Sequence, residues 1–107
     1  GIKYLDFIRK RYFSDSGMDG FNQTMFAFAA YNAGPARIRK LRTMAEQEGY
    51  YPNVWFDNVE IMASRDIGRE TVEYVANILK YYLAYSFSVQ RQLEREQSRI
   101  KAGIKSG

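Results

Sequence analysis

The sequence contains neither cysteine nor histidine among its 107 residues. Without cysteine, the chain can form no disulfide framework and can carry no thiolate nucleophile. Without histidine, it lacks the commonest general base and the commonest metal ligand. Acid–base chemistry must therefore come from Asp, Glu, Lys or Tyr side chains. We expect neither a metal site nor a cofactor.

Long apolar runs are absent as well. No stretch reaches the ~18 apolar residues of a membrane-spanning helix, and no signal peptide is visible. The chain starts at Gly1 without an initiator methionine, so we expect it to be an excised piece of a longer protein. Strand signals are nearly absent, and glycine and proline fall between helical segments. These absences predict an all-α fold.

What the sequence has is apolar and aromatic residues with a modest basic excess. Hydrophobic residues make up 46% of the chain, enough for the core of one domain. Sixteen basic and twelve acidic residues give a net charge of +4. This charge favours anionic partners, although a solvated surface explains it equally. Nine tyrosines suit a sugar-binding cleft, because each ring has an apolar face and a polar tip. Alternatively, most of the aromatic rings are core.

The first half of the chain predicts two helices joined by a loop. Residues 2–13 have one apolar face, and residues 14–20 have the composition of a loop. Residues 21–33 are apolar all round, which indicates a buried helix, and Asn22 could cap it. The residues expected to face inward are Ile2, Leu5, Ile8, Tyr12, Phe21, Met25 and Phe28.

Gly34 and Pro35 separate the second helix from a third, which we expect to run to Glu48. Glycine suits the left-handed residue that ends a helix, and proline suits the first turn of the next. On the third helix we expect Ile38, Leu41 and Ala45 inside and a basic outer face made of Arg37, Arg39, Lys40 and Arg42.

The second half of the chain predicts a loop, a short helix and a long one. Asn53 could cap the short helix, residues 64–68 are expected to be irregular, and the long helix starts near Arg69. Residues 94–107 form a charged, solvated tail. The apolar residues of these helices are Trp55, Phe56, Val59, Met62, Val72, Val75, Leu79, Tyr82, Val89 and Leu93.

The stretch from Phe28 to Pro35, Phe-Ala-Ala-Tyr-Asn-Ala-Gly-Pro, resembles the signature of the lytic transglycosylases that cleave bacterial peptidoglycan. Residues 1–5, 59–62 and 69–75 are similar to further parts of the same family, in the same order. Their spacing is most similar to the membrane-bound, modular members. The resemblance covers roughly residues 1–90 and implies the C-terminal half of a lysozyme-like helical domain, so that residues 1–107 form one domain fragment.

The resemblance implies cleavage between N-acetylmuramic acid and N-acetylglucosamine with formation of a 1,6-anhydro sugar. Most glycosidases use two carboxylates. In this family one glutamate suffices, because the muramic 6-hydroxyl is the nucleophile. That glutamate lies in a Glu-Ser motif upstream of the signature, and no acidic residue here has a matching context. We therefore expect no catalytic residue in this chain and an inactive fragment.

By resemblance, Ala30, Tyr31, Asn32 and Tyr74 bind substrate, and Gly34, Pro35 and Glu70 are structural. Asn32 can donate and accept the hydrogen bonds that an N-acetyl group requires. Alternatively, Asn32 only caps the helix end, and Tyr31 and Tyr74 are packed in the core.

The expected partner is a peptidoglycan glycan strand in the bacterial periplasm or cell envelope. We expect no nucleic acid and no tight membrane contact by this segment, but self-association through the face that the missing half leaves exposed. A non-catalytic peptidoglycan-binding module on the same scaffold is the alternative function. A helical nucleic-acid binder is a weaker third hypothesis, because the basic residues gather on one short helix and no docking motif occurs.

Overall fold

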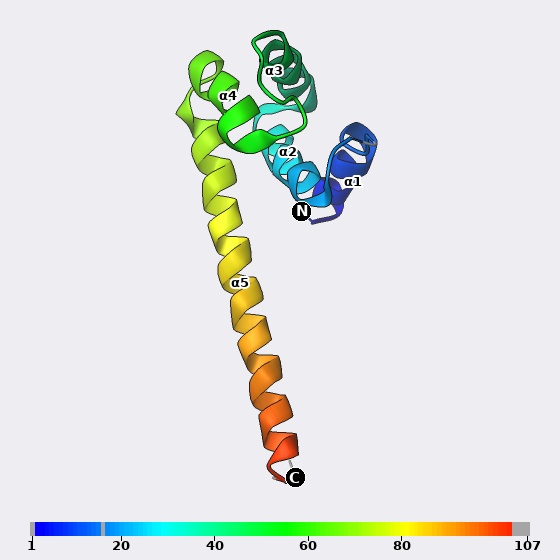
Figure 1. The fold of residues 1–107 in the computed structure, drawn as a ribbon, viewed down its shortest axis with the longest axis vertical. Helices are drawn as coiled ribbons and strands as arrows, with labels where there is room; N and C mark the ends of the chain where they lie inside the picture. Colours follow the sequence, from blue (N-terminus) through cyan, green and yellow to red (C-terminus); the bar gives the residue numbers. More distant parts are fainter. Residues whose placement is uncertain (1, 16, 104–107) are drawn as a thin grey trace. The chain divides into compact units, whose positions relative to one another are not determined.

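The computed structural model describes residues 2–15 and 17–103 and is all-α over these residues, as expected. Gly1 of the first family-like stretch, Ser16 of the predicted loop and residues 104–107 of the predicted tail lie outside the described residues. The helices are α1 (Ile2–Tyr12), α2 (Gly20–Ala33), α3 (Pro35–Gln47), α4 (Glu60–Asp66) and α5 (Arg69–Lys101), with an irregular turn, η1 (Trp55–Val59), before α4 (Figure 1).

The helix that is apolar on all sides, α2, is buried, as predicted. Every residue from Met25 to Ala30 is buried, and both α1 and α3 pack against this helix (Figure 1). Among the residues of α2 that were predicted to face inward, Phe21 is the exception, since it is about half exposed. It lies in the first turn of α2 and stacks on Phe56 of η1, with ring centroids 6.2 Å apart.

The two predicted caps are wrong. Asp19, not Asn22, caps α2, and its carboxylate accepts hydrogen bonds from both the backbone and the side chain of Asn22. Asn22 is itself buried, and its Oδ1 accepts the backbone N–H of Trp55 at 2.9 Å. The Asn53 side chain caps no helix, because it bonds to Arg42 and to the carbonyl oxygen of Gly17. Both asparagines connect segments that are distant in sequence.

On α3, the predicted inner residues Ile38, Leu41 and Ala45 are all buried. The prediction that Arg42 belongs to the solvated basic face is wrong. Its side chain is only 15% exposed and lies over the rings of Phe13 and Phe26, 5.8 and 5.3 Å from their centroids. Arg42 lies next to the buried face of α3, and its side chain turns inward because it binds acceptors in the neighbouring loops.

The guanidinium group of Arg42 joins α3 to two loops. Its Nε donates to the carbonyl oxygen of Pro52 at 3.0 Å, and its Nη2 donates to Asn53 Oδ1 at 2.6 Å. Nη2 also lies 3.5 Å from the Asp15 carboxylate. We call these four residues, Arg42, Pro52, Asn53 and Asp15, the Arg42 clasp. Gly17 fits closely against it, because a Cβ there would lie 2.9 Å from Asn53 Nδ2.

The short helix predicted around residues 55–62 starts later than expected and ends later as well. Phe56 has extended backbone angles and Asp57 has a φ of +60°, so the regular helix begins only at Glu60. Residues 64–66, expected to be irregular, continue α4 to Asp66. Trp55 is fully buried and packs edge-on against Phe26, with centroids 5.8 Å apart. This packing, which is not local, holds the chain in a non-helical turn.

The ends of α3 and α4 are joined by an ion pair on the surface. Arg65 in the last turn of α4 donates hydrogen bonds from its two terminal nitrogens, Nη1 and Nη2, to the carboxylate of Glu48, at 2.9 and 2.6 Å. The hydrogen bonds from Arg65 lower the pKa of Glu48 below its usual 4.5. A second carboxylate, Asp66, shares the same guanidinium group at 3.1 Å.

The inward pattern predicted for the first and last helices holds only in part. Ile8 and Val75 are buried, but Ile2 is 86% exposed at the start of α1. The contacts divide the chain into two units, one ending at Asn77 and the other beginning at Ile78. In the second unit, Tyr82 and Leu93 are exposed although their spacing predicted them inside. None of the helices in the described residues is long and apolar enough to cross a membrane.

Candidate functional site

The turn between α2 and α3 ends one helix and starts the next without an intervening loop. Gly34 has a φ of +96°, in the region that favours glycine, and its N–H donates to the carbonyl oxygen of Ala30 at 2.7 Å. Pro35 is the first residue of α3, where its missing N–H costs nothing. Both observations match the sequence prediction for this turn. The last turn of α2 is thereby fixed beside the start of α3.

Of the four predicted substrate-binding residues, Tyr31 and Tyr74 come together from α2 and α5. Their rings are nearly parallel, with an interplanar angle of 4° and centroids 6.4 Å apart. Tyr31 is 43% exposed, so it is not a core residue, and Tyr74 is half-buried. The pKa of the Tyr74 hydroxyl is raised above its usual 10, mainly by partial burial and secondly by the neighbouring Tyr31. At neutral pH this hydroxyl is therefore protonated and can donate a hydrogen bond.

The tyrosine pair continues into two further aromatic rings on α1. The ring of Tyr4 meets Tyr31 edge-on at 5.8 Å, and Phe7 stacks near Tyr4 at 6.3 Å. About half of each of these α1 side chains is exposed. We call Phe7, Tyr4, Tyr31 and Tyr74 the aromatic row. Tyr4 and Phe7 were not among the site residues predicted from the sequence, although Tyr4 lies in a family-like stretch.

Asn32 follows Tyr31 and is held by Thr71, a residue that was not predicted from the sequence to belong to the site. The Thr71 hydroxyl of α5 donates to Asn32 Oδ1 at 2.7 Å, which joins the end of α2 to the start of α5. Asn32 is half-buried, and Thr71 is buried. With its oxygen occupied, the Asn32 side chain presents its amide N–H groups as donors. Thr71 directly follows Glu70 in the family-like stretch of residues 69–75, and this position is the sequence feature from which its role could have been predicted.

The remaining predicted residues have different surroundings. Ala30 is buried, with 2% of its surface exposed, so its side chain supports the helix rather than facing solvent. Glu70 lies exposed in the first turn of α5, where the helix dipole favours a negative charge. In the described part of the chain, no group of three or more Asp and Glu side chains is placed to hold a metal ion.

Replacing Thr71 with valine should lower the free energy of unfolding by about 1 kcal/mol, because valine keeps the shape but removes the donor to half-buried Asn32 Oδ1. Urea denaturation followed by circular dichroism measures the change. Thr43→Val is the matched control, since the exposed Thr43 hydroxyl bonds only to the Arg39 carbonyl oxygen in its own helix. Equal losses in the two variants would contradict a structural role for the Asn32–Thr71 bond.

Comparison with known proteins gives the family. No family model matches the chain. Over 91% of its length it is 34% identical to a protein of Pseudomonas fluorescens and 32% identical to one of Pseudomonas syringae. A protein of Pseudomonas putida is 31% identical over 88% of the chain. The chain spans about a fifth of the length of these relatives, 22% in each case.

These matches, together with the fold and the Ala30–Pro35 turn, define a helical segment of an enzyme family that acts on murein. The chain belongs to the lytic murein transglycosylase family. The three relatives are each named membrane-bound lytic murein transglycosylase F, which agrees with the predicted similarity to membrane-bound members.

Proposed function

We propose that the chain is the substrate-cleft half of a peptidoglycan lytic transglycosylase and works in the envelope of a bacterium. The aromatic row is the observation that carries this proposal, because three helices converge to expose four rings on one part of the surface. Apolar ring faces suit the C–H faces of sugars, and tyrosine hydroxyls suit their hydroxyl groups. The names of the relatives support murein as the polymer that is bound.

In this proposal each residue of the site has a role in holding the glycan. Tyr31 and Tyr74 contact sugar rings, and the protonated Tyr74 hydroxyl donates to a sugar oxygen. The Asn32 amide, with its oxygen occupied by Thr71, donates to the carbonyl oxygen of an N-acetyl group. Ala30, Gly34 and Pro35 fix the turn that presents these side chains.

The reaction that we propose for the whole protein cleaves the N-acetylmuramic acid–N-acetylglucosamine bond and forms a 1,6-anhydro product. A single carboxylic acid protonates the leaving oxygen, and its carboxylate then assists attack by the muramic 6-hydroxyl. Such an acid requires apolar surroundings that raise its pKa. We propose that another segment of the protein supplies it and that this chain alone does not catalyse the reaction.

Exposed apolar side chains in the second unit support the half-domain proposal. Large apolar residues from Tyr81 onward have more than half of their surface exposed, more than a solvated helix normally carries. Covering by another segment, or self-association of the isolated chain, would remove this surface from water. These residues are Tyr81, Tyr82, Leu83, Tyr85, Phe87, Leu93 and Ile100.

Incubation of the 107-residue chain with purified sacculi tests the proposal. We expect it to co-sediment with sacculi and to release no 1,6-anhydro-muropeptides, as measured by liquid chromatography and mass spectrometry. Anhydro products from the chain alone would contradict the absence of the acid. Failure to co-sediment would contradict glycan binding.

A chimera separates the enzyme from a non-catalytic binding module. The chain is joined to the preceding part of the matching domain from the Pseudomonas fluorescens relative, with that part alone as control. Release of anhydro products by the chimera only would support the enzyme. A folded chimera that binds sacculi without releasing products would support the binding module.

A further inference from the structure

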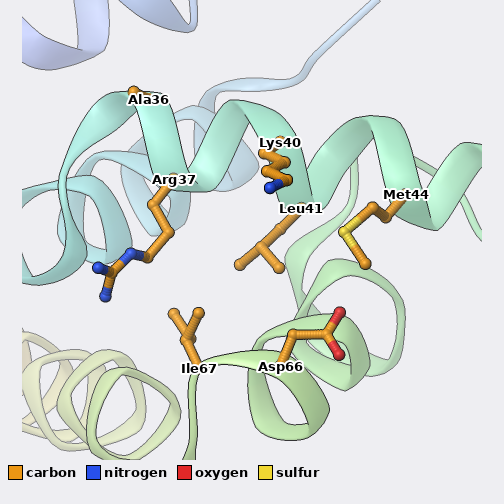
Figure 2. A pocket seen from close by; sticks show the side chains of 7 residues that line it. All are labelled: Ala36, Arg37, Lys40, Leu41, Met44, Asp66 and Ile67. Atoms are coloured by element: carbon orange, nitrogen blue, oxygen red, sulfur yellow. The ribbon is translucent and has the colours of Figure 1, made fainter.

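Outside the aromatic row, α3 and the end of α4 line an open groove of about 660 Å³ (Figure 2). Its apolar lining comes from Leu41 and Met44 on α3 and from Ile67 on the opposite side. Figure 2 shows Arg37 and Lys40 extending from α3 on one wall and Asp66 standing on the opposite wall. The groove therefore combines apolar contact with charges of both signs.

Within the part of the chain that the structure describes, neither cation of the groove is in an ion pair, which is also true of Arg39 and Arg95, but only Arg37 and Lys40 line the groove. Arg9, Arg42, Arg65, Arg69 and Arg99 each lie within ion-pair distance of a carboxylate. No ion pair within the described residues involves Arg37 or Lys40, and both side chains are exposed. Asp66, in contrast, already shares the Arg65 guanidinium group. The groove thus offers two positive charges without an ion-pair partner among the described residues, next to apolar side chains.

The groove and the aromatic row flank the same two turns. Asn32 precedes the Gly34–Pro35 turn, and Arg37 follows it within the first turn of α3. On the other side, Ile67 ends α4 four residues before Thr71, which is hydrogen-bonded to Asn32. Gly68, with a φ of +93°, turns the chain between them. Two short turns of the chain therefore connect the groove to the residues of the aromatic row and its neighbour Asn32.

We propose that this groove binds the peptide stem of peptidoglycan while the aromatic row binds the glycan, an inference that rests on the proposed function. The stem branches from the muramic acid and carries carboxylates, alanine methyl groups and, in its diamino acid, an ammonium group. Arg37 binds a carboxylate through its planar fork, and Lys40 attracts another as a compact charge. Leu41, Met44 and Ile67 contact the methyl groups, and Asp66 faces the ammonium group.

Calorimetric titration with two soluble probes tests the groove. One is a peptidoglycan tetrasaccharide with stems, and the other is the same sugar after an amidase has removed them. We expect the unchanged chain to bind the stem-bearing probe about tenfold more tightly. Arg37→Gln/Lys40→Gln should reduce this ratio to about one and leave the affinity for the stem-free sugar unchanged.

Arg39→Gln/Arg95→Gln is the matched control, because it removes the same charge from exposed positions outside the groove. It should keep the tenfold ratio. If the Arg37/Lys40 variant keeps the ratio, or if the control loses it as well, the stem site is overturned. If the unchanged chain binds the sugar equally with and without stems, only the stem site fails. If it binds neither probe, the proposed function itself fails.

Discussion

Replacing Arg42 with methionine should lower the free energy of unfolding by about 3 kcal/mol, a large part of the stability of a small domain. Methionine keeps much of the apolar stem but removes the charge and every donor. The Pro52 carbonyl oxygen and Asn53 Oδ1 then lose their charged partner in a half-buried place. The faces of Phe13 and Phe26 lose their cation as well. Urea denaturation at neutral pH measures the loss.

Two further variants separate the Arg42 clasp from a simple loss of charge. Arg42→Lys keeps the charge but loses the planar guanidinium group with its several donors. Its loss of stability should therefore be about half of that in Arg42→Met. Arg39→Met removes an exposed arginine from the same helix and should change stability by less than about 0.5 kcal/mol. If Arg39→Met is as costly as Arg42→Met, the clasp does not stabilise the fold in the way that its geometry implies.

Replacing Tyr31 with alanine should weaken binding of the stem-free tetrasaccharide about tenfold, which corresponds to about 1.4 kcal/mol. Tyr31 is the centre of the aromatic row, since Tyr4 meets its ring edge-on and Tyr74 lies parallel to it. Its removal takes away one apolar face and opens a gap between the two neighbouring rings. Calorimetric titration measures the affinity, and circular dichroism checks that the variant is folded.

Controls for Tyr31 distinguish sugar binding from a general loss of exposed aromatic surface. Tyr31→Phe keeps the ring and should retain most of the affinity. Tyr51→Ala removes a more exposed ring, 73% accessible, from the loop before η1 and outside the row, and should have no effect. An unchanged affinity in Tyr31→Ala, or an equal loss in Tyr51→Ala, would contradict a sugar site on the aromatic row.

The sequence predicted the helices best where the pattern is local. The boundaries at Gly34 and Pro35 follow from backbone preferences of single residues, and the burial of α2 follows from apolar residues on all sides. Errors arose where a long-range contact competes with a local preference. Asn22 resembles a cap in sequence, but the Trp55 backbone, 33 residues away, takes its side-chain oxygen.

The residues of the candidate site were likewise predicted only in part. Tyr31, Asn32 and Tyr74 were named from a motif, which gives residues but no geometry. Tyr4, Phe7 and Thr71 join them only because α1 and α5 approach the end of α2. Arg37 and Lys40 were seen as a basic face, and only the opposite wall at Asp66 and Ile67 turns that face into a groove.

By itself, the sequence determined an all-α chain, the buried α2 helix, the turn at Gly34 and the family to which the chain is related. These features depend on composition, on spacing along one helix or on single backbone conformations. Only the tertiary structure decided that Arg42 points inward, that Asn22 and Asn53 connect distant segments, and that four rings form one row. Such contacts depend on which helices meet, and the free energy of a hydrogen bond or a stacked ring is gained only once both partners are brought together.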